Sequence, residues 1–201
     1  MLGFACWCHN LHIHCHRARS VYPYAGWVRG AIMRFKFDDE TDRVRHLGPL
    51  MTPLLSVFGA DTNLALVPVP LHETRLAERG FNQSDLLAQE IARQTGVPVK
   101  PMLVRARRTA QQANLAKAER TENVRGAFAL SPEWFPAASD RLVLVDDVMT
   151  TGATMQACTD VLVRAGVRDV GMLTLARDLQ PRELGAYFAR HGLEVPARPG
   201  H

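Results

Sequence analysis

The chain has 201 residues, of which 47% are hydrophobic, and it carries a formal net charge of +4 at pH 7. This length suits about one globular domain plus a small additional segment, and the composition is sufficient for an ordinary core. The mild basic excess suits a polyanionic substrate or a nucleic acid without choosing between them. Two prolines interrupt residues 64–71, and no other stretch is long and apolar enough for a membrane span. We therefore expect a cytoplasmic protein that does not insert into membranes.

Potential metal ligands crowd the first residues, where Cys6, Cys8 and Cys15 stand among several histidines. A four-ligand zinc site usually uses close pairs such as C-x2-C, because a tight turn then brings both sulfurs to one ion. Only one residue separates Cys6 from Cys8, so on an extended chain their sulfurs share a face but lie apart. Three thiols and one imidazole could still hold Zn²⁺, or the segment could bind nothing, and both interpretations stay open.

Two stretches with helical periodicity follow. Residues 26–35 mix apolar and basic side chains and predict an amphipathic helix with a basic flank. Lys36, just beyond, could reach a phosphate or lie on a solvated face. Residues 47–58 keep helical spacing of apolar side chains, and Pro53 within them predicts a kink or a break.

The middle of the chain alternates between predicted strands and helices. Residues 64–71 predict a strand that ends in prolines, and Ser84 is a candidate cap for a helix over residues 85–95. The loop between them carries Arg75 and Arg79. Arginines at the carboxyl end of a strand suit recognition of a diphosphate, although a charged surface loop is the plainer interpretation.

A long polar and basic segment, residues 105–123, is a poor core element. We expect a loop that folds over a bound anion, with strands before it at 97–104 and after it at 127–130. Candidate anion-binding residues in the loop are Arg107, Gln111 and Arg120. Further along, the pattern predicts strands at 142–145 and 167–175 and helices at 155–165 and 181–191.

The most informative stretch is LVLVDDVMTTGAT, residues 142–154. Its unbroken apolar start predicts a strand buried on both faces of a parallel sheet, with Asp146 and Asp147 at the carboxyl end where ligands bind in open α/β sheets. The turn that follows contains small and hydroxyl residues and opens a helix, so it can aim several backbone N–H groups at one anion. That turn consists of Thr150, Thr151, Gly152, Ala153 and Thr154.

A phosphate-sized nest beside two carboxylates suits ribose 5-phosphate, whose vicinal hydroxyls can donate hydrogen bonds to the acids. A P-loop would require Lys after its last Gly, where Ala153 stands, and a dinucleotide fingerprint would require three glycines. The stretch resembles the PRPP-binding motif of type I phosphoribosyltransferases at every position.

Other motifs narrow this resemblance. Over residues 22–177 the chain resembles the ComF family of competence proteins, through YAGWVRGAIMRFKF, Pro68-Val-Pro70, RLAERGFNQS and RRTAQQANLAKAERTENVRGAF. The resemblance implies a phosphoribosyltransferase fold and a cytoplasmic role in DNA uptake during natural transformation. Many members also carry an N-terminal zinc finger with two C-x2-C pairs. Here one pair is missing and the other is irregular.

Together these patterns predict an α/β fold of the type I phosphoribosyltransferase kind, with a mostly parallel sheet of about five strands flanked by helices and a small N-terminal hood. Residues 1–21 would form a degenerate zinc-finger-like segment and 22–62 a helical hood over the strand ends. Residues 63–192 would form the phosphoribosyltransferase-like core, and 193–201 a tail.

The expected ligand is PRPP or another phosphorylated ribose, bound with Mg²⁺. Asp146 and Asp147 would be the catalytic residues, accepting the ribose hydroxyls and helping to hold Mg²⁺ through its waters. The turn at 150–154 would bind the 5′-phosphate, and the arginines and loop residues the diphosphate. Three functions stay open: a phosphoribosyltransferase serving DNA uptake, a non-catalytic module that binds single-stranded DNA and other competence proteins, or a nucleobase-salvage phosphoribosyltransferase.

Overall fold

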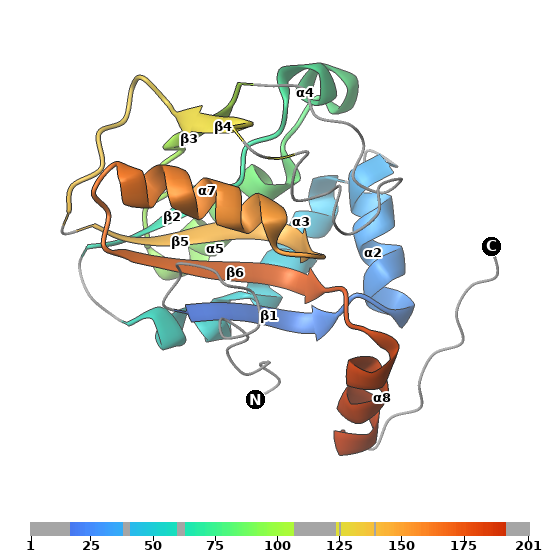
Figure 1. Cartoon of the computed structure of the whole chain (residues 1–201). Coiled ribbons are helices and arrows are strands. Elements are labelled where there is room, and N and C mark those ends of the chain that lie inside the picture. The colour runs from blue at the N-terminus through green and yellow to red at the C-terminus, as the bar shows by residue number, and fades with distance from the viewer. Residues whose placement is uncertain are drawn as a thin grey trace.

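The computed structural model describes residues 17–37, 41–59, 63–106, 124, 126–138 and 140–191. Its main sheet has four parallel strands in the order β1-β6-β5-β2 (Figure 1). The strands are β1 (Arg17–Pro23), β6 (Asp169–Arg177), β5 (Arg141–Met149) and β2 (Leu64–Pro68). Two short strands, β3 (Leu103–Arg105) and β4 (Phe128–Leu130), form a separate antiparallel pair. The predicted mostly parallel sheet flanked by helices is confirmed.

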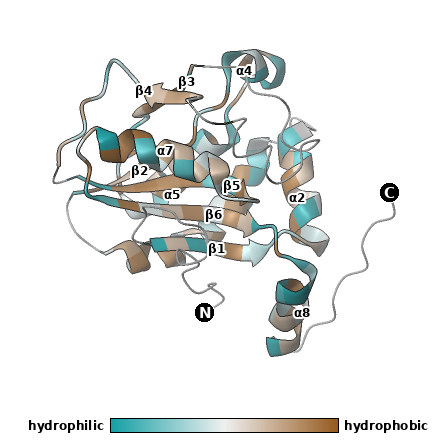
Figure 2. Cartoon of the chain, viewed as in Figure 1, coloured by the Kyte–Doolittle hydropathy of each residue, from teal (hydrophilic) through white to brown (hydrophobic). Residues whose placement is uncertain are grey.

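The alternation of side chains along β5 produces two apolar layers, one on each face of the sheet. Leu142 and Leu144 belong to the layer beneath α7 (Ala153–Arg164) and the β3–β4 pair. Val143 and Val145 belong to the layer shared with α5 (Gln83–Thr95) and the helices that precede β2. β2, β5 and β6 are therefore apolar along most of their length, as strands buried on both faces must be, whereas β1 carries hydrophilic residues (Figure 2).

The predicted hood region is helical but interrupted. It contains α2 (Gly26–Phe37), the short helix α3 (Val44–Leu47) and 3-10 turns at Thr41–Arg43, Gly48–Leu50 and Thr52–Phe58. A proline stands in the first turn of each of the last two segments, which explains why the predicted helix at 47–58 is broken there. The arrows of β5 and β6 point toward α2 (Figure 1), so this helix lies at the carboxyl ends of the strands.

The strand β1 was not predicted, and the boundary proposed between residues 21 and 22 cuts through it. It pairs parallel with β6, from Arg17 opposite Gly171 to Pro23 opposite Arg177. Its polar side chains find partners in the fold, since Ser20 Oγ lies 2.6 Å from Thr174 Oγ1. With no continuous apolar run, the segment carries no strand signal, and tertiary pairing decides its structure.

Three further predictions in the middle of the chain need correction. The predicted strand at 97–104 is reduced to β3, with an isolated bridge between Val99 and Leu66. The loop before α5 contains a short helix, α4 (Glu73–Arg79), which Gly80 ends in a left-handed conformation. The cap of α5 is Asn82 rather than Ser84, because the Asn82 side chain accepts a hydrogen bond from the Ser84 backbone N–H at 3.1 Å.

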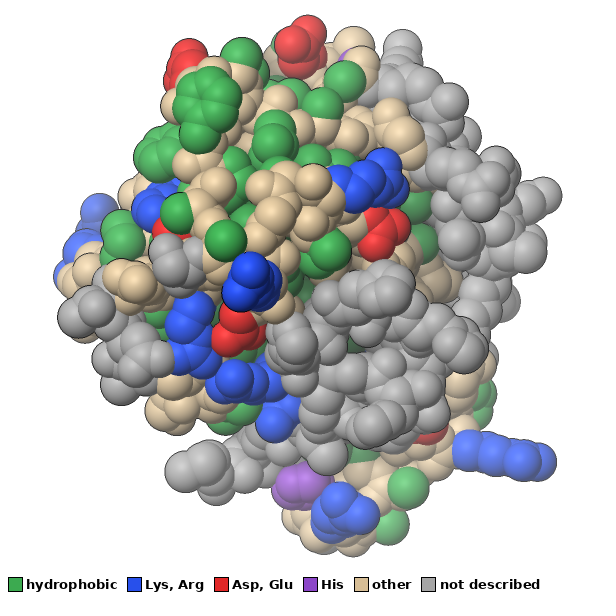
Figure 3. Space-filling model, turned by 60° about the vertical axis from the view of Figure 1, so that its left-hand side comes forward, with side chains coloured by type: hydrophobic (Ala, Val, Ile, Leu, Met, Phe, Trp, Pro, Cys, Tyr) green, Lys and Arg blue, Asp and Glu red, His purple; other side chains and the backbone are tan. Residues whose placement is uncertain are grey.

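Ion pairs join the strands where they begin, on the side of the molecule that Figure 3 brings forward. Asp169 of β6 lies 2.9 Å from the Arg141 guanidinium of β5 and 3.8 Å from that of Arg17 in β1. At these strand starts Arg17 and Arg141 also donate hydrogen bonds to the backbone carbonyls of Val57 and Phe58. The last helix, α8 (Pro181–Arg190), extends away from the sheet (Figure 1). No helix in the described ranges has the length and apolar character needed to cross a bilayer.

Candidate functional site

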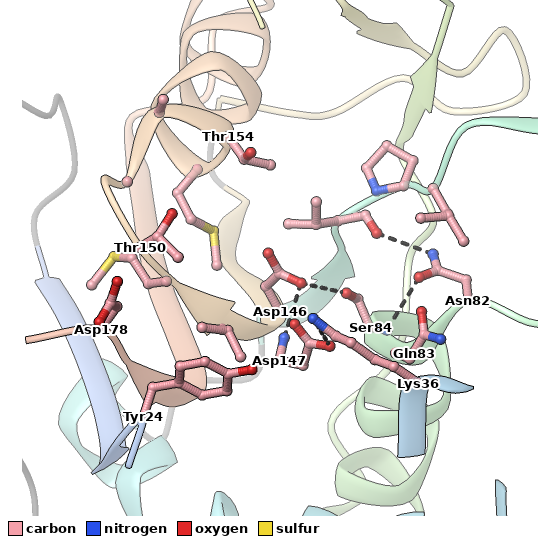
Figure 4. A pocket seen from close by; sticks show the side chains of 18 of the residues that line it. Tyr24, Lys36, Asn82, Gln83, Ser84, Asp146, Asp147, Thr150, Thr154 and Asp178 are labelled. Carbon is pink, nitrogen blue, oxygen red and sulfur yellow. Dashed lines mark hydrogen bonds and ion pairs between the residues drawn. The ribbon is translucent and has the colours of Figure 1, made fainter. Parts of the chain in front are cut away.

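A cavity of about 550 Å³ opens at the carboxyl end of β5 (Figure 4). Four parts of the chain line it: the hood, the segment from β2 to α5, the end of β5, and the turn that starts α7. The cavity brings together the predicted residues Arg75, Arg79, Asp146, Asp147, Thr150, Thr151, Gly152, Ala153 and Thr154. Residues as far apart in sequence as Tyr24 and Asp178 therefore share one site.

The two carboxylates lie at the floor of the cavity, where β5 runs past the apolar core. Asp146 Oδ1 accepts hydrogen bonds from Ser84 Oγ at 2.7 Å and from the Asp147 backbone N–H at 2.9 Å. Burial, together with the neighbouring Asp147 carboxylate, raises the pKa of Asp146 to about 7. A ligand that brings positive charge or hydrogen-bond donors to this carboxylate would stabilise its ionised form.

Asp147 faces the hood and is held by a lysine from it. Lys36 Nζ lies 2.9 Å from Asp147 Oδ2, with side-chain exposures of 22% for the lysine and 7% for the aspartate. Burial opposes the charged form of Lys36, but the attraction of Asp147 outweighs it and raises the pKa of the lysine. Lys36 therefore does not lie on a solvated face. Its partner is a carboxylate, and its contact with a phosphate stays a prediction.

The turn after β5, where the sequence predicts an anion nest, leads directly into the N-terminus of α7. Gly152 adopts a left-handed conformation, with φ of 80°, and is the N-cap of α7. A residue with a Cβ is strained in this conformation, so glycine is required for the turn. Thr151 Oγ1 accepts a hydrogen bond from the Ala153 backbone N–H at 3.3 Å. No acidic residue stands in the first turn of α7, so its N-terminus is electrostatically suited to an anion.

Guanidinium groups gather on the β2 side of the cavity. Arg75 and Arg79 come from the unpredicted helix α4, and Arg105 comes from the end of β3. Burial and the charge of Arg75 lower the pKa of Arg79, and the same two causes lower the pKa of Arg105. The positive charges of these guanidinium groups repel one another, and a bound anion would relieve the repulsion.

Sequence reasoning missed several residues that line the cavity. Asn82-Gln83-Ser84, a run of polar residues just before a predicted helix, was the available signal for three of them. The polar and aromatic residues not predicted for the site include Tyr24, Asn82, Gln83, Ser84 and Asp178.

Other predicted site residues lie outside the described residues. These are Arg107, Gln111 and Arg120 of the basic loop and the candidate zinc ligands Cys6, Cys8 and Cys15. Among the residues that are described, no group of three or more His, Cys, Asp or Glu side chains is placed to hold a metal ion.

A helix start beside two carboxylates at the end of a parallel sheet is the arrangement of a phosphoribosyltransferase-like protein, and this is the class to which the chain belongs. The family described as "Phosphoribosyl transferase domain" matches residues 82–195, which contain both carboxylates and the nest.

Three curated relatives show which family within this class the chain belongs to. "Competence protein F" of Haemophilus influenzae is 34% identical over 153 residues, which are 73% of this chain and 66% of that protein. "DNA utilization protein YhgH" of Escherichia coli K12 is 36% identical over 170 residues, covering 81% of this chain and 73% of the relative. "Competence protein ComFC" of Bacillus subtilis is 31% identical over 160 residues, covering 79% and 63% respectively. The chain belongs to the ComF family of competence proteins, as the sequence motifs predict.

Proposed function

We propose that this protein binds PRPP, or a closely related ribose 5-phosphate, together with Mg²⁺, and that it acts in DNA uptake during natural transformation. The observation that carries the proposal is the meeting of two carboxylates, a helix-start nest and several arginines in one cavity. Each of these groups suits a different part of the same ligand: the ribose hydroxyls, the 5′-phosphate and the diphosphate.

The carboxylates suit both the sugar and the metal. Asp146 is hydrogen-bonded to Ser84 through one oxygen, and burial together with the neighbouring Asp147 carboxylate raises its pKa. Vicinal ribose hydroxyls can donate to Asp146 and Asp147, and carboxylate oxygens are the donors that Mg²⁺ prefers, often through its waters. When bound, Mg²⁺ would supply positive charge that stabilises a departing diphosphate.

Phosphoribosyl transfer would then proceed at the anomeric carbon. The bond from that carbon to the diphosphate breaks, the electron pair leaves with the diphosphate, and an acceptor nucleophile forms the new bond. Arg75 and Arg79 are suited to stabilise the leaving group, because charge develops on it as the bond breaks. The nest at residues 150–154 would hold the 5′-phosphate throughout and so keep the reacting carbon in place.

The role in DNA uptake rests on the relatives. Their names are competence protein and DNA utilization protein. For the present chain we propose the same role, with other competence proteins as partners.

A second candidate function is binding of single-stranded DNA without catalysis. The basic side chains that line the cavity favour it, because a flexible strand can place its phosphates between them. Those side chains are Arg29, Lys36, Arg75, Arg79 and Arg105.

Calorimetric titration tests the proposal directly. Wild-type protein with Mg²⁺ should bind PRPP and ribose 5-phosphate, and the Asp146→Asn/Asp147→Asn variant should bind both more weakly by at least about tenfold. This loss corresponds to a charge-assisted hydrogen bond of about 1.5–3 kcal/mol. Unchanged affinity in the folded double variant would remove the ribose assignment. Titration with a short single-stranded oligonucleotide in the same buffer measures the second candidate.

A further inference from the structure

Three consecutive polar residues at the start of α5 face the cavity, and the middle one has an unused hydrogen-bond donor. Asn82 Nδ2 donates to the Val69 carbonyl at 3.0 Å, and Ser84 Oγ donates to Asp146 at 2.7 Å. Gln83 is only 3% exposed, and its Nε2 has no hydrogen-bond partner within the described part of the chain. Buried amide N–H groups are normally paired, and an exception at a site is a place where a ligand acceptor fits.

The orientation of the Gln83 amide follows from its neighbour. Arg79 Nη1 donates to Gln83 Oε1 at 3.2 Å. A guanidinium can only donate, so the atom facing it is the oxygen and the unused group is the N–H. The free donor of Gln83 is thus held beside a guanidinium, and a ligand atom placed there would meet a cation and an N–H together.

The chemistry around this donor selects an anion. Besides Arg79, the side chains of Arg75 and Arg105 line the same part of the cavity, and burial together with the charge of Arg75 disfavours the charged forms of Arg79 and Arg105. An uncharged acceptor would pair with the Gln83 N–H but would leave the repulsion between the guanidinium groups in place. An oxyanion would pair with the N–H and also relieve that repulsion, because charge-assisted hydrogen bonds from amide and guanidinium groups are among the strongest in proteins.

The position across the cavity indicates which part of the ligand this anion belongs to. In Figure 4, Thr150 and Thr154 lie on one side of the two carboxylates, and Asn82 and Gln83 lie on the other. A ribose with its 5′-phosphate in the nest and its hydroxyls on the carboxylates would extend its anomeric substituent toward Gln83. The geometry points to Gln83 as a further residue of the diphosphate subsite proposed above, donating its amide N–H to an anionic oxygen and orienting Arg79 through its carbonyl oxygen. The identity of the anion as diphosphate rests on the proposed function, whereas the role of Gln83 rests on its buried N–H in the cavity, which has no partner among the described residues.

Calorimetry with inorganic diphosphate and Mg²⁺ tests the subsite without the ribose. Wild type should bind, and Gln83→Leu should weaken the affinity by at least about tenfold, the effect of losing one hydrogen bond to a charged group. Gln83→Glu keeps an acceptor for Arg79 but replaces the donor with a negative charge, so it should bind more weakly still. The matched control is Gln89→Leu, at an exposed position of the same helix, which should bind within about twofold of wild type.

Titration with ribose 5-phosphate, which lacks the diphosphate, tests the role of Gln83 separately from the proposed binding of a phosphorylated ribose. The affinity for ribose 5-phosphate should change by no more than about twofold in Gln83→Leu. The role of Gln83 is overturned if diphosphate does not bind the wild type, or if it binds Gln83→Leu equally well. It is also overturned if Gln83→Leu melts like the wild type but loses affinity equally for diphosphate and for ribose 5-phosphate. Binding of diphosphate without any binding of ribose 5-phosphate would support the subsite and overturn the proposed function.

Discussion

Lys36 Nζ lies 2.9 Å from Asp147 Oδ2, and this ion pair connects the last turn of the hood helix α2 to the end of the central strand β5. Lys36 is also within electrostatic reach of Asp146 and Tyr24, which further favour the charged lysine. The negative charge of Asp147, one of the two aspartates proposed to bind ribose, is therefore balanced by a lysine of the hood before a ligand arrives. Any ligand that takes over Asp147 has to compete with Lys36.

Lys36→Met should destabilise the ligand-free protein by about 1–3 kcal/mol, because it leaves a buried carboxylate without its partner. Denaturant unfolding monitored by circular dichroism measures the change. The control is Lys100→Met, whose pair with Asp140 is longer, at 3.4 Å, and more exposed, so it should cost less. In a double-mutant cycle, Lys36→Met with Asp147→Asn should lose less stability than the two single variants combined. Simple additivity would contradict the pairing.

The stability of the ligand-free protein should depend on pH through Asp146, whose pKa rises from an ordinary 3.8 to about 7. Between these values the folded state binds more protons than the unfolded state, so the free energy of unfolding falls as the pH rises. The stabilisation is present below about pH 4 and is lost as the pH rises through about 7.

Asp146→Asn removes this titration while keeping an acceptor for Ser84. In buffer with a chelator, the variant should melt at least about 2 °C above wild type at pH 8, and the gap should close toward pH 4. Thermal melts across this range measure it, with Asp178→Asn as the control at an exposed position. A gap that stays constant with pH would contradict the raised pKa of Asp146.

Direct binding of single-stranded DNA should depend on the arginines of the cavity and fall steeply as salt rises, because phosphate contacts release counterions. Arg75→Ala/Arg79→Ala should reduce both the affinity and the salt slope, and Arg107→Ala/Arg108→Ala should do the same if the basic loop takes part. Arg182→Ala/Arg190→Ala on α8 removes the same charge from exposed positions and is the matched control. PRPP should compete if the strand uses the nest. A gel shift at low salt that gives no complex at any protein concentration would exclude direct binding.

Zinc at the start of the chain is an independent prediction, based on Cys6, Cys8, Cys15 and a nearby histidine. Protein purified without chelator should contain about one zinc per chain, and a chelator should lower the melting temperature. Elemental analysis of the Cys6→Ser/Cys8→Ser variant provides the control. Wild-type protein without zinc would indicate that residues 1–21 form a degenerate zinc-finger-like segment that does not bind the metal.

The central motif could be predicted because its signals are local. An apolar run, two acids and a glycine turn are adjacent in sequence, so the sequence places Asp146 and Asp147 toward the carboxyl end of β5, although the strand extends past the predicted residues 142–145 to Met149 and includes both acids. The left-handed turn follows from Gly152, since a single residue determines whether that backbone conformation is accessible. Fold class and the position of the turn proposed to bind phosphate were therefore contained in the sequence.

Contacts between distant segments could not be predicted in this way. Arg17–Pro23 carries no strand signal, and it becomes a strand because β6 offers it an edge. Lys36 meets Asp147, and Gln83 accepts from Arg79 while its Nε2 has no partner among the described residues, only because packing of the apolar layers brings the hood and α5 to the end of β5. Sequence periodicity determines which face of an element is buried, but the partner across a cavity depends on how those buried faces fit together.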